Sequence, residues 1–507
     1  MRYLIGADIG TSGTKTVLFD ENMREIASES AEYPMYQPQN GWAEQDAKDW
    51  YDAVIKTIKG VIGKSGVKGE DIKGIGLSGQ MHGLVMLDED NKVLRRSIIW
   101  CDQRTEKECR EITEKTGEKR LIEITANPAL TGFTASKIMW VKNNEPEIFE
   151  KCRHILLPKD YIRFMLTGEY ATEVSDASGM QLLDVPNRCW SDEVLEKLGI
   201  DKDMLGKVYE SVEITGYVKK DIAELTGLKE GTPVVGGAGD NAAAAVGTGI
   251  VREGAAFTTI GTSGVVYAHT DKPVIDKKGR VHTFCCAVPN CWHVMGVTQA
   301  AGLSLRWARD TFCEDIVKRA EESGKDAYIE MNELAEKSDI GSNKLIYLPY
   351  LMGERTPHLD PDCRGVFFGL SASHTKGDII RAVMEGVSLS LCDCREILEE
   401  MGINADDMTL CGGGAKSELW TRITADCYGC DVARLENEQG PALGAAILAG
   451  VGTGIFESVE AACGEFVKKR EKIKFSEDAH RKYERVHEIY KRLYGSLKED
   501  FKALGGM

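Results

Sequence analysis

The five residues Ile-Gly-Thr-Ser-Gly occur twice in this chain, at positions 9–13 and again at positions 260–264. The two copies stand roughly half a chain apart, and 507 residues are too many for a single hydrophobic core. An apolar run precedes and follows each copy, so each is predicted to be a turn between two strands. The repeat therefore predicts two related domains, the first in residues 1–247 and the second in residues 248–507.

Apolar runs of strand length alternate along the chain with segments of helical periodicity, which is the pattern of an α/β protein. No low-complexity linker separates the two halves, so the domains are expected to adjoin, and a cleft between domains is where ligands usually bind. The last helix is expected to dock on the second domain. The expected strands are Tyr3–Ile9, Thr16–Phe19, Ile72–Ser78, Ala256–Ile260, Val265–Ala268 and Met408–Cys411, and the expected helices are Asp49–Ile62, Gly377–Met401 and Ser476–Leu504.

The composition excludes several classes of partner. The formal net charge of −17 argues against a nucleic-acid surface, because binding to phosphate backbones needs a basic face. No run of about 20 residues is apolar enough to cross a bilayer. The N-terminal apolar run is broken by Asp8, so no signal peptide is expected, and 15 scattered cysteines suit a reducing cytoplasm. The pair Cys427 and Cys430 is interpreted as buried small side chains rather than a zinc or redox site.

Both repeated turns combine small side chains with free backbone N–H groups, which makes them candidate anion sites. The first is not a Walker A loop, because a threonine stands where that motif needs glycine. A plain hairpin turn is the alternative for one copy, and the second copy makes it less favourable. Asp8 precedes the first turn and offers the hard oxygen ligand that Mg²⁺ prefers. The candidate phosphate-binding residues are Thr11, Ser12, Gly261 and Thr262.

A glycine cluster with one acid precedes the second turn. Gly237-x-Gly239-x-x-Ala242 nearly matches the dinucleotide fingerprint, but that fingerprint puts no acid in the loop, where it would repel pyrophosphate. Asp240 is alternatively a helix N-cap or a positioned base. We favour the base, which does not exclude a capping role.

Two more loops follow predicted strands. Gly412 to Gly414 would let a flat or bulky ligand approach the backbone, whereas a loop that only needs one positive φ angle would hardly need three glycines. His82 follows Met81 between two glycines. A lone histidine is more often structural, but the carboxyl end of a strand is where α/β proteins bind ligands.

These segments carry a family resemblance that covers the chain from Ile5 to about Gly450. They are Asp8-x-Gly-Thr-Ser12, Gly79-Gln-Met-His-Gly83, Trp100-x-Asp-x-Arg104, Lys137-x-x-Trp140, Thr172-x-x-Ser-Asp-Ala-Ser-Gly179, Gly239-Asp-Asn241, Gly261-Thr-Ser-Gly264, and the most specific, Leu348-Pro-Tyr-Leu-Met-Gly-Glu-Arg-Thr-Pro-His358 running into Arg364-Gly-Val-Phe-Phe-Gly-Leu370. Together they resemble the carbohydrate kinases that include glycerol kinase, gluconate kinase and ribulokinase, and within them the xylulokinase group most.

The resemblance implies two ribonuclease-H-like, actin-like ATPase domains with ATP and Mg²⁺ in the cleft between them. It implies a cytoplasmic enzyme of xylose catabolism that phosphorylates D-xylulose to D-xylulose 5-phosphate, with ribulose, erythritol or glycerol as alternative acceptors. Family members are often homodimers. The implied roles are proton acceptor for Asp240, sugar contact for Met81, His82 and Asn241, metal and phosphate contact for Asp8, phosphoryl contact for Thr262, and adenosine contact for Gly413 and Gly414.

The sequence leaves two other classes of protein possible. A non-catalytic nucleotide-binding relative, such as a chaperone, filament or sugar-sensing regulator, would not need a sugar loop or a base in the cleft. A dinucleotide oxidoreductase rests only on the near-match at Gly237 to Ala242, and it predicts a nicotinamide absorbance change with polyols.

Overall fold

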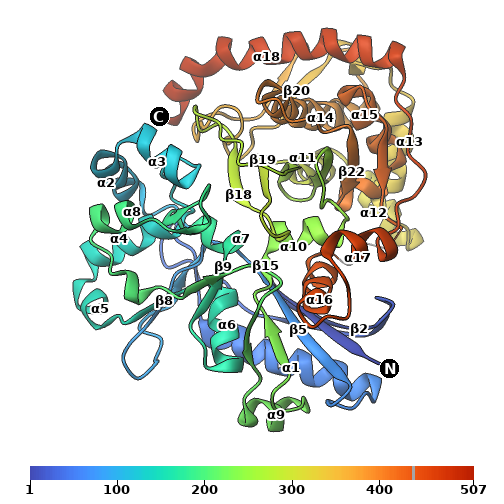
Figure 1. Cartoon of the computed structure of the whole chain (residues 1–507). Coiled ribbons are helices and arrows are strands. Elements are labelled where there is room, and N and C mark those ends of the chain that lie inside the picture. The colour runs from blue at the N-terminus through green and yellow to red at the C-terminus, as the bar shows by residue number, and fades with distance from the viewer. Residues whose placement is uncertain (437–439, 507) are drawn as a thin grey trace.

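The computed structural model describes residues 1–436 and 440–506, which contain two large sheets lying side by side (Figure 1). The first sheet has the strand order β13-β14-β5-β1-β2-β3, with β15 paired to β5, and the second has the order β18-β19-β17-β16-β22-β23. The strands of these two sheets are β1 (Tyr3–Ile9), β2 (Gly13–Asp20), β3 (Glu25–Glu32), β5 (Ile72–Gly79), β13 (Ile214–Tyr217), β14 (Pro233–Val235), β15 (Ala238–Gly239), β16 (Ala255–Ile260), β17 (Gly264–Thr270), β18 (His282–Cys285), β19 (Trp292–Thr298), β22 (Asp407–Cys411) and β23 (Val432–Arg434).

The two sheets share one connectivity. In the first, β1 is antiparallel to β2 and β2 to β3, while β5 is parallel to both β1 and β14. In the second, β16 is antiparallel to β17 and β17 to β19, while β22 is parallel to both β16 and β23. The repeated pentapeptide therefore lies in equivalent turns, between β1 and β2 and between β16 and β17. The duplication predicted from the sequence is present in the fold.

Helices and short two-stranded sheets surround the two main sheets. The helices are α1 (Ala47–Ser65), α2 (Glu106–Thr116), α3 (Glu118–Thr125), α4 (Thr134–Asn144), α5 (Pro146–Lys151), α6 (Pro158–Thr167), α7 (Val174–Ala177), α8 (Asp192–Leu198), α9 (Lys220–Thr226), α10 (Asp240–Gly247), α11 (Gly302–Phe312), α12 (Glu314–Ser323), α13 (Ala327–Glu336), α14 (Lys376–Glu400), α15 (Glu418–Tyr428), α16 (Gly440–Gly452), α17 (Val459–Phe466) and α18 (Glu477–Gly505). The short strands are β4 (Glu44–Gln45), β6 (Val85–Leu87), β7 (Ser97–Ile98), β8 (His154–Leu156), β9 (Ala171–Glu173), β10 (Leu183–Asp184), β11 (Cys189–Trp190), β12 (Lys207–Tyr209), β20 (Ile346–Leu348) and β21 (Val366–Phe368).

Helix α16 follows the second sheet in sequence but packs on β1 and β5 of the first sheet and against α10. Glycine makes this contact possible. A Cβ atom added to Gly76 would lie 1.8 Å from the carbonyl oxygen of Ala445, and one added to Gly444 would lie 1.9 Å from that of Ala243. Since α10 begins at Asp240, the packing of α16 helps to place the candidate base.

Helix α18 docks on the second domain, as expected, and runs along its outer edge (Figure 1). Its His487 lies between two carboxylates of α14, with Nε2 2.7 Å from Asp393 and Nδ1 3.3 Å from Glu396. Burial opposes a charge on this histidine, but the hydrogen bonds to Asp393 and Glu396 outweigh it and raise the pKa of His487 to about 10. Because both ring nitrogens face carboxylates, the group is a charged histidine bridge between helices.

This bridge predicts a pH-dependent contribution to stability. A folded-state pKa raised above that of the unfolded chain gives stability that is complete below about pH 6.5 and is lost as the pH rises through about 10. We expect His487→Gln to lower the thermal midpoint by a few degrees at pH 6 and by much less at pH 10. Lys482→Gln, exposed on the same helix, is the control and should change the midpoint little at either pH. An equal loss at both pH values for His487→Gln would contradict the charged bridge.

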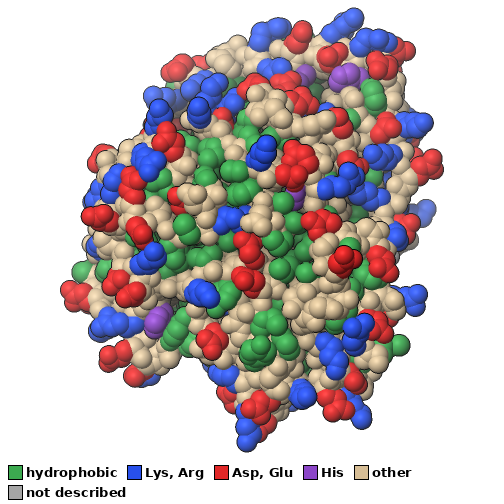
Figure 2. All heavy atoms as spheres, viewed as in Figure 1, with side chains coloured by type: hydrophobic (Ala, Val, Ile, Leu, Met, Phe, Trp, Pro, Cys, Tyr) green, Lys and Arg blue, Asp and Glu red, His purple; other side chains and the backbone are tan. Residues whose placement is uncertain are grey.

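The distribution of charged side chains and the burial of the cysteines can be compared with what the composition predicts. On the face shown in Figure 2, acidic and basic side chains are interspersed over the outer parts, whereas hydrophobic ones gather along the centre. Cys427 and Cys430 are buried, as expected, and no disulfide joins any of the cysteines. Among the described helices, none combines the length and the apolar character needed to span a membrane.

Candidate active site

Three strand ends meet at one edge of the first sheet. In register, Asp8 of β1 lies beside Ser78 of β5, and Ser78 lies beside Ala238 of β15, two residues before Asp240. The Ser78 hydroxyl donates a hydrogen bond of 2.8 Å to Asp8 Oδ1. The sheet therefore brings Asp8 and Asp240, which are more than 200 residues apart, to the same place.

Asp240 has the electrostatic properties of a base. Burial and the nearby charge of Asp8 raise the pKa of its carboxyl to about 7. Oδ1 accepts hydrogen bonds from the backbone N–H of Asn241 at 2.7 Å and from its side-chain amide at 3.0 Å. Among the described residues, no group donates a hydrogen bond to Oδ2, and the side chain is partly exposed. A partner hydroxyl can therefore reach this oxygen.

The N-cap interpretation of Asp240 is wrong. Helix α10 begins at Asp240 itself, and Gly239 is the N-cap, without a side-chain cap. Asp240 lies in the first helical turn, where the partial positive charge of the helix N-terminus favours the carboxylate. Gly239 is the last residue of β15 and has an extended backbone, so Asp240 follows the strand directly at the start of the helix.

A buried polar network that the sequence did not single out holds this backbone in place. The Ser175 hydroxyl accepts a hydrogen bond of 3.1 Å from Gly239 N–H and donates one of 2.8 Å to Glu173. Lys159, completely buried, lies 3.6 Å from Glu173 and 3.5 Å from Asp176. The sequence indicates the stretch Thr172–Gly179 only through the family resemblance. Its physical role is to fix the segment that ends in Asp240.

The Met81–His82 loop lies beside Asp240. A Cβ added to Gly239 would lie 2.8 Å from Met81 Cγ, and one added to Gly179 would lie 2.5 Å from the His82 ring. His82 has a φ angle of 69°, and its Nδ1 lies 2.8 Å from the carbonyl oxygen of Gly179. A carbonyl oxygen only accepts, so Nδ1 carries the proton and Nε2 is left as an acceptor. Burial and the Lys137 charge lower the pKa of His82 to about 3, which keeps the ring neutral.

Two basic residues lie close to this loop and were not predicted as site residues. Lys137 of α4 donates hydrogen bonds to the carbonyl oxygens of His82 at 2.9 Å and Gly132 at 2.7 Å. Arg355, from the loop after β20 of the second domain, lies near enough for its charge to lower the pKa of His82. Among the described residues, its guanidinium has no hydrogen-bond or ion-pair partner. The sequence shows the motif around Arg355, but it does not predict that Arg355 lies close to His82 of the other domain.

The second repeated turn borders a cavity of about 520 Å³. Four of the predicted residues, Gly261, Thr262, Gly413 and Gly414, line it. Its further lining includes aromatic and basic side chains such as Tyr328, Trp420 and Arg306, which suit a nucleoside with phosphates. Thr11 and Ser12 lie in the first turn, next to Asp8, and Thr11 Oγ1 accepts a hydrogen bond of 2.9 Å from the Trp100 indole.

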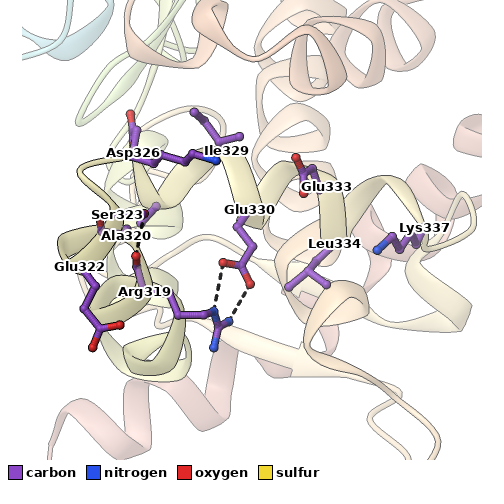
Figure 3. A pocket seen from close by; sticks show the side chains of 12 residues that line it. Arg319, Ala320, Glu322, Ser323, Asp326, Ile329, Glu330, Glu333, Leu334 and Lys337 are labelled. Atoms are coloured by element: carbon purple, nitrogen blue, oxygen red, sulfur yellow. Dashed lines mark hydrogen bonds and ion pairs between the residues drawn. The ribbon is translucent and has the colours of Figure 1, made fainter.

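A second hollow, of about 570 Å³, lies over α12 and α13 and is shown in Figure 3. Charged side chains line most of it, and Arg319 and Glu330 form an ion pair of 2.6 Å across it. It shares Asp326 and Ile329 with the nucleotide-sized cavity but contains none of the predicted site residues.

Sequence comparison identifies the family. The description "FGGY family of carbohydrate kinases, N-terminal domain" matches residues 3–247, and that of the C-terminal domain of the same family matches residues 256–453. The chain belongs to the FGGY family of carbohydrate kinases. The predicted family, enzyme class and actin-like two-domain fold are confirmed, and as a member of this family the chain is an ATP-dependent sugar kinase.

Individual relatives cover the whole chain. The xylulose kinase of Bacillus subtilis (strain 168) is 40% identical over 499 residues, which are 98% of each chain. The ligand-bound xylulose kinase of Lactobacillus acidophilus has a TM-score of 0.93 at 27% identity, covering 99% of this chain and 100% of the other. The gluconate kinase of the same organism has a TM-score of 0.92 at 28% identity, covering 99% of each chain. Fold similarity alone thus does not separate xylulose from gluconate kinases.

Proposed function

We propose that the protein phosphorylates D-xylulose to D-xylulose 5-phosphate with ATP and Mg²⁺. The observation that carries the proposal is the partly exposed Asp240, with the Met81–His82 loop on one side and Asp8 on the other. The high identity to xylulose kinases over the whole chain supports this acceptor against ribulose, erythritol or glycerol. The cytoplasmic location and the homodimer remain predictions.

In this proposal the oxygen of the sugar C5 hydroxyl attacks the γ-phosphorus of ATP. Asp240 accepts the proton of that hydroxyl, and ADP leaves. A base with a pKa near 7 suits this role, because a substantial fraction of it is ionised at neutral pH and it still binds a proton well. Phosphoryl transfer otherwise needs positioning and charge neutralisation more than covalent chemistry. Closure of the two domains would exclude water as a competing acceptor.

The residues at the first-sheet edge fit a magnesium ion. Mg²⁺ prefers carboxylate oxygens and keeps several waters, and Asp8 presents a partly exposed carboxylate at a strand end. Burial raises the pKa of Asp8, which means that the surroundings stabilise its carboxylate charge poorly, and a bound cation would stabilise it. When bound, Mg²⁺ would neutralise phosphate charge. Lys15, directly across from Asp8 on β2, adds a positive charge at the same edge.

The proposed binding and catalytic roles are divided between the two domains. Residues 1–247 carry the sugar contacts Met81, His82 and Asn241, the base, and the first turn with Thr11 and Ser12. Residues 248–507 carry Thr262 and Gly261 at the phosphates, and Gly413 and Gly414 at the adenosine. We add Arg355 as a contact that the second domain supplies to the sugar side, since it lies close enough for its charge to act on His82.

His82→Ala should raise the KM for D-xylulose by about 2- to 10-fold, the cost of one hydrogen bond from a sugar hydroxyl to Nε2. The KM for ATP should not change. His154→Ala removes a histidine of the same domain that stacks on Tyr170, and it should change neither constant. Steady-state kinetics with each substrate varied in turn measures both. An equal rise of both KM values in His82→Ala would place His82 outside the sugar pocket.

The structure of the product tests the proposed function. Incubation of the enzyme with D-xylulose, ATP and Mg²⁺, followed by phosphorus and carbon NMR, should show ADP and a sugar phosphorylated on C5. A phosphate on C1, or ADP formed without sugar phosphate, would contradict the proposal.

A further inference from the structure

Two buried glutamines contact the first repeated turn. Gln45 ends β4 and Gln80 follows β5, and neither residue is exposed to solvent. Nε2 of Gln45 donates a hydrogen bond of 2.7 Å to the carbonyl oxygen of Thr11, and Nε2 of Gln80 donates one of 3.3 Å to that of Gly10. Gln80 lies in one of the segments that carry the family resemblance, but the sequence indicates no role for either glutamine.

The two glutamines also hold each other in place. Nε2 of Gln80 donates a hydrogen bond of 2.7 Å to Oε1 of Gln45, and the same oxygen accepts one of 3.2 Å from the indole of Trp50 in α1. An indole N–H can only donate, so the oxygen of the Gln45 amide must face Trp50 and its nitrogen must face the turn. The network therefore has one arrangement of donors and acceptors.

A tyrosine occupies the remaining carbonyl oxygens of the turn. Tyr33, the residue after β3, donates its hydroxyl proton to the carbonyl oxygen of Gly10 at 2.5 Å and its backbone N–H to that of Ser12 at 3.3 Å. With the two glutamines, all three carbonyl oxygens between Gly10 and Ser12 accept hydrogen bonds from the protein. A carbonyl oxygen turned toward a phosphate would repel it, and here none is free to turn.

Fixing these oxygens also fixes the N–H groups of the turn. In a trans peptide unit the C=O and N–H bonds point in opposite directions. The bond from Gln80 to Gly10 therefore directs the N–H of Thr11 away from the glutamines, and the bond from Gln45 to Thr11 directs the N–H of Ser12 likewise. Neither N–H donates to any residue within 1–436 or 440–506. Two adjacent N–H groups of this kind form a concavity that binds anions.

The second repeated turn reaches the same orientation by other means. Gly302 N–H, at the start of α11, donates a hydrogen bond of 2.7 Å to the carbonyl oxygen of Gly261, and Ala301 N–H donates one of 3.0 Å to that of Thr262. The N–H groups of Thr262 and of the residue after it again have no acceptor in the described part of the chain. This turn borders the nucleotide-sized cavity. Both domains therefore hold the equivalent carbonyl oxygens and leave the equivalent N–H groups free.

We propose that Gln45 and Gln80 are positioning residues that orient the N–H groups of the first turn toward the phosphates of ATP. Their side chains do in the first domain what the backbone at the start of α11 does in the second. The inference rests on the proposed phosphate contacts of Thr11 and Ser12, and it does not depend on which sugar is the acceptor.

Calorimetric titration with ATP and Mg²⁺ tests the proposal. Gln45→Met and Gln80→Met keep the length of the side chain but cannot donate to the turn, and each should weaken ATP binding by about 10- to 100-fold, the range for a lost hydrogen bond to a charged group. Adenosine, which has no phosphate, should bind each variant with an affinity within twofold of that of the wild type. A purely structural role would change both affinities together.

Gln181→Met is the matched control. Gln181 is 1% exposed, and its amide also donates to two carbonyl oxygens, those of Pro128 at 2.6 Å and Asn127 at 3.3 Å. Its loss should lower the thermal midpoint as the other two changes do, but ATP affinity should not change. Tyr33→Phe, which removes one hydroxyl and keeps the ring, is the milder variant should the glutamine variants fail to fold. It should weaken ATP binding by about 2- to 10-fold.

The results separate this inference from the proposed function. If the wild-type protein binds ATP but Gln45→Met and Gln80→Met bind it equally well, only the inference is overturned. Equal losses of ATP and adenosine affinity would overturn it too, because the glutamines would then only support the fold. With glutamine variants that do not fold, unchanged ATP affinity in Tyr33→Phe would have the same consequence. A wild-type protein that binds no ATP would overturn the proposed function itself, and the inference with it.

Discussion

Asp240→Asn is expected to lower kcat for D-xylulose phosphorylation by about 10²- to 10⁴-fold, the range for loss of a well-placed general base. The fold should survive, because an asparagine side-chain oxygen can still accept both hydrogen bonds from Asn241. The thermal midpoint should stay equal or rise slightly, since burial and Asp8 disfavour the native carboxylate. ATP binding, measured by calorimetry, should be nearly unchanged.

The same residue predicts the pH dependence of the wild-type enzyme. A base acts when it is deprotonated, so kcat/KM for the sugar should fall as the pH drops through about 7. Asp192→Asn, a change on an exposed carboxylate, is the control and should keep both the rate and the profile. Full activity of Asp240→Asn would remove Asp240 from the role of base.

Gly444→Ala is expected to be strongly destabilising although it adds one methyl group. That Cβ would lie 1.9 Å from the carbonyl oxygen of Ala243 and 3.0 Å from Gly247 N, both backbone atoms of α10. Only separation of α10 and α16 relieves the clash, at a cost of at least about 1–3 kcal/mol. Because α10 begins at Asp240, kcat should fall as well as the thermal midpoint.

Gly63→Ala is the matched control. Gly63 is an exposed residue of α1, and a Cβ added there meets nothing within 4 Å. Alanine is the better helix former, so this change should stabilise the protein by about 0.5–1 kcal/mol. If both variants unfold at the same temperature, close packing of α10 on α16 does not hold the domains together.

Local patterns predicted the strands and long helices well, because apolar periodicity is a local property. The strand Tyr3–Ile9 begins and ends as expected, and the expected helix Gly377–Met401 differs from α14 by one residue at each end. The N-cap alternative for Asp240 failed because β15 extends to Gly239 and leaves no residue between strand and helix.

Contacts between segments that are distant along the chain could not be predicted from the sequence. Nothing in the alanine- and glycine-rich α16 indicates that it packs on the first sheet rather than on the second, which precedes it in the chain. The roles of Lys137 and Arg355 depend on which backbone and ring they face, and those partners come from distant segments. Residue types predicted the chemistry, but only the fold shows which of them share a site.

The most direct test of the central claim is the release of ADP by the wild-type enzyme with a panel of acceptors. The panel contains D-xylulose, ribulose, gluconate, erythritol and glycerol, each at the same ATP and Mg²⁺ concentrations, and a reaction without any acceptor. We predict the highest kcat/KM with D-xylulose and almost no ADP without an acceptor. A higher kcat/KM with another acceptor, or ADP release that does not depend on sugar, would contradict the account.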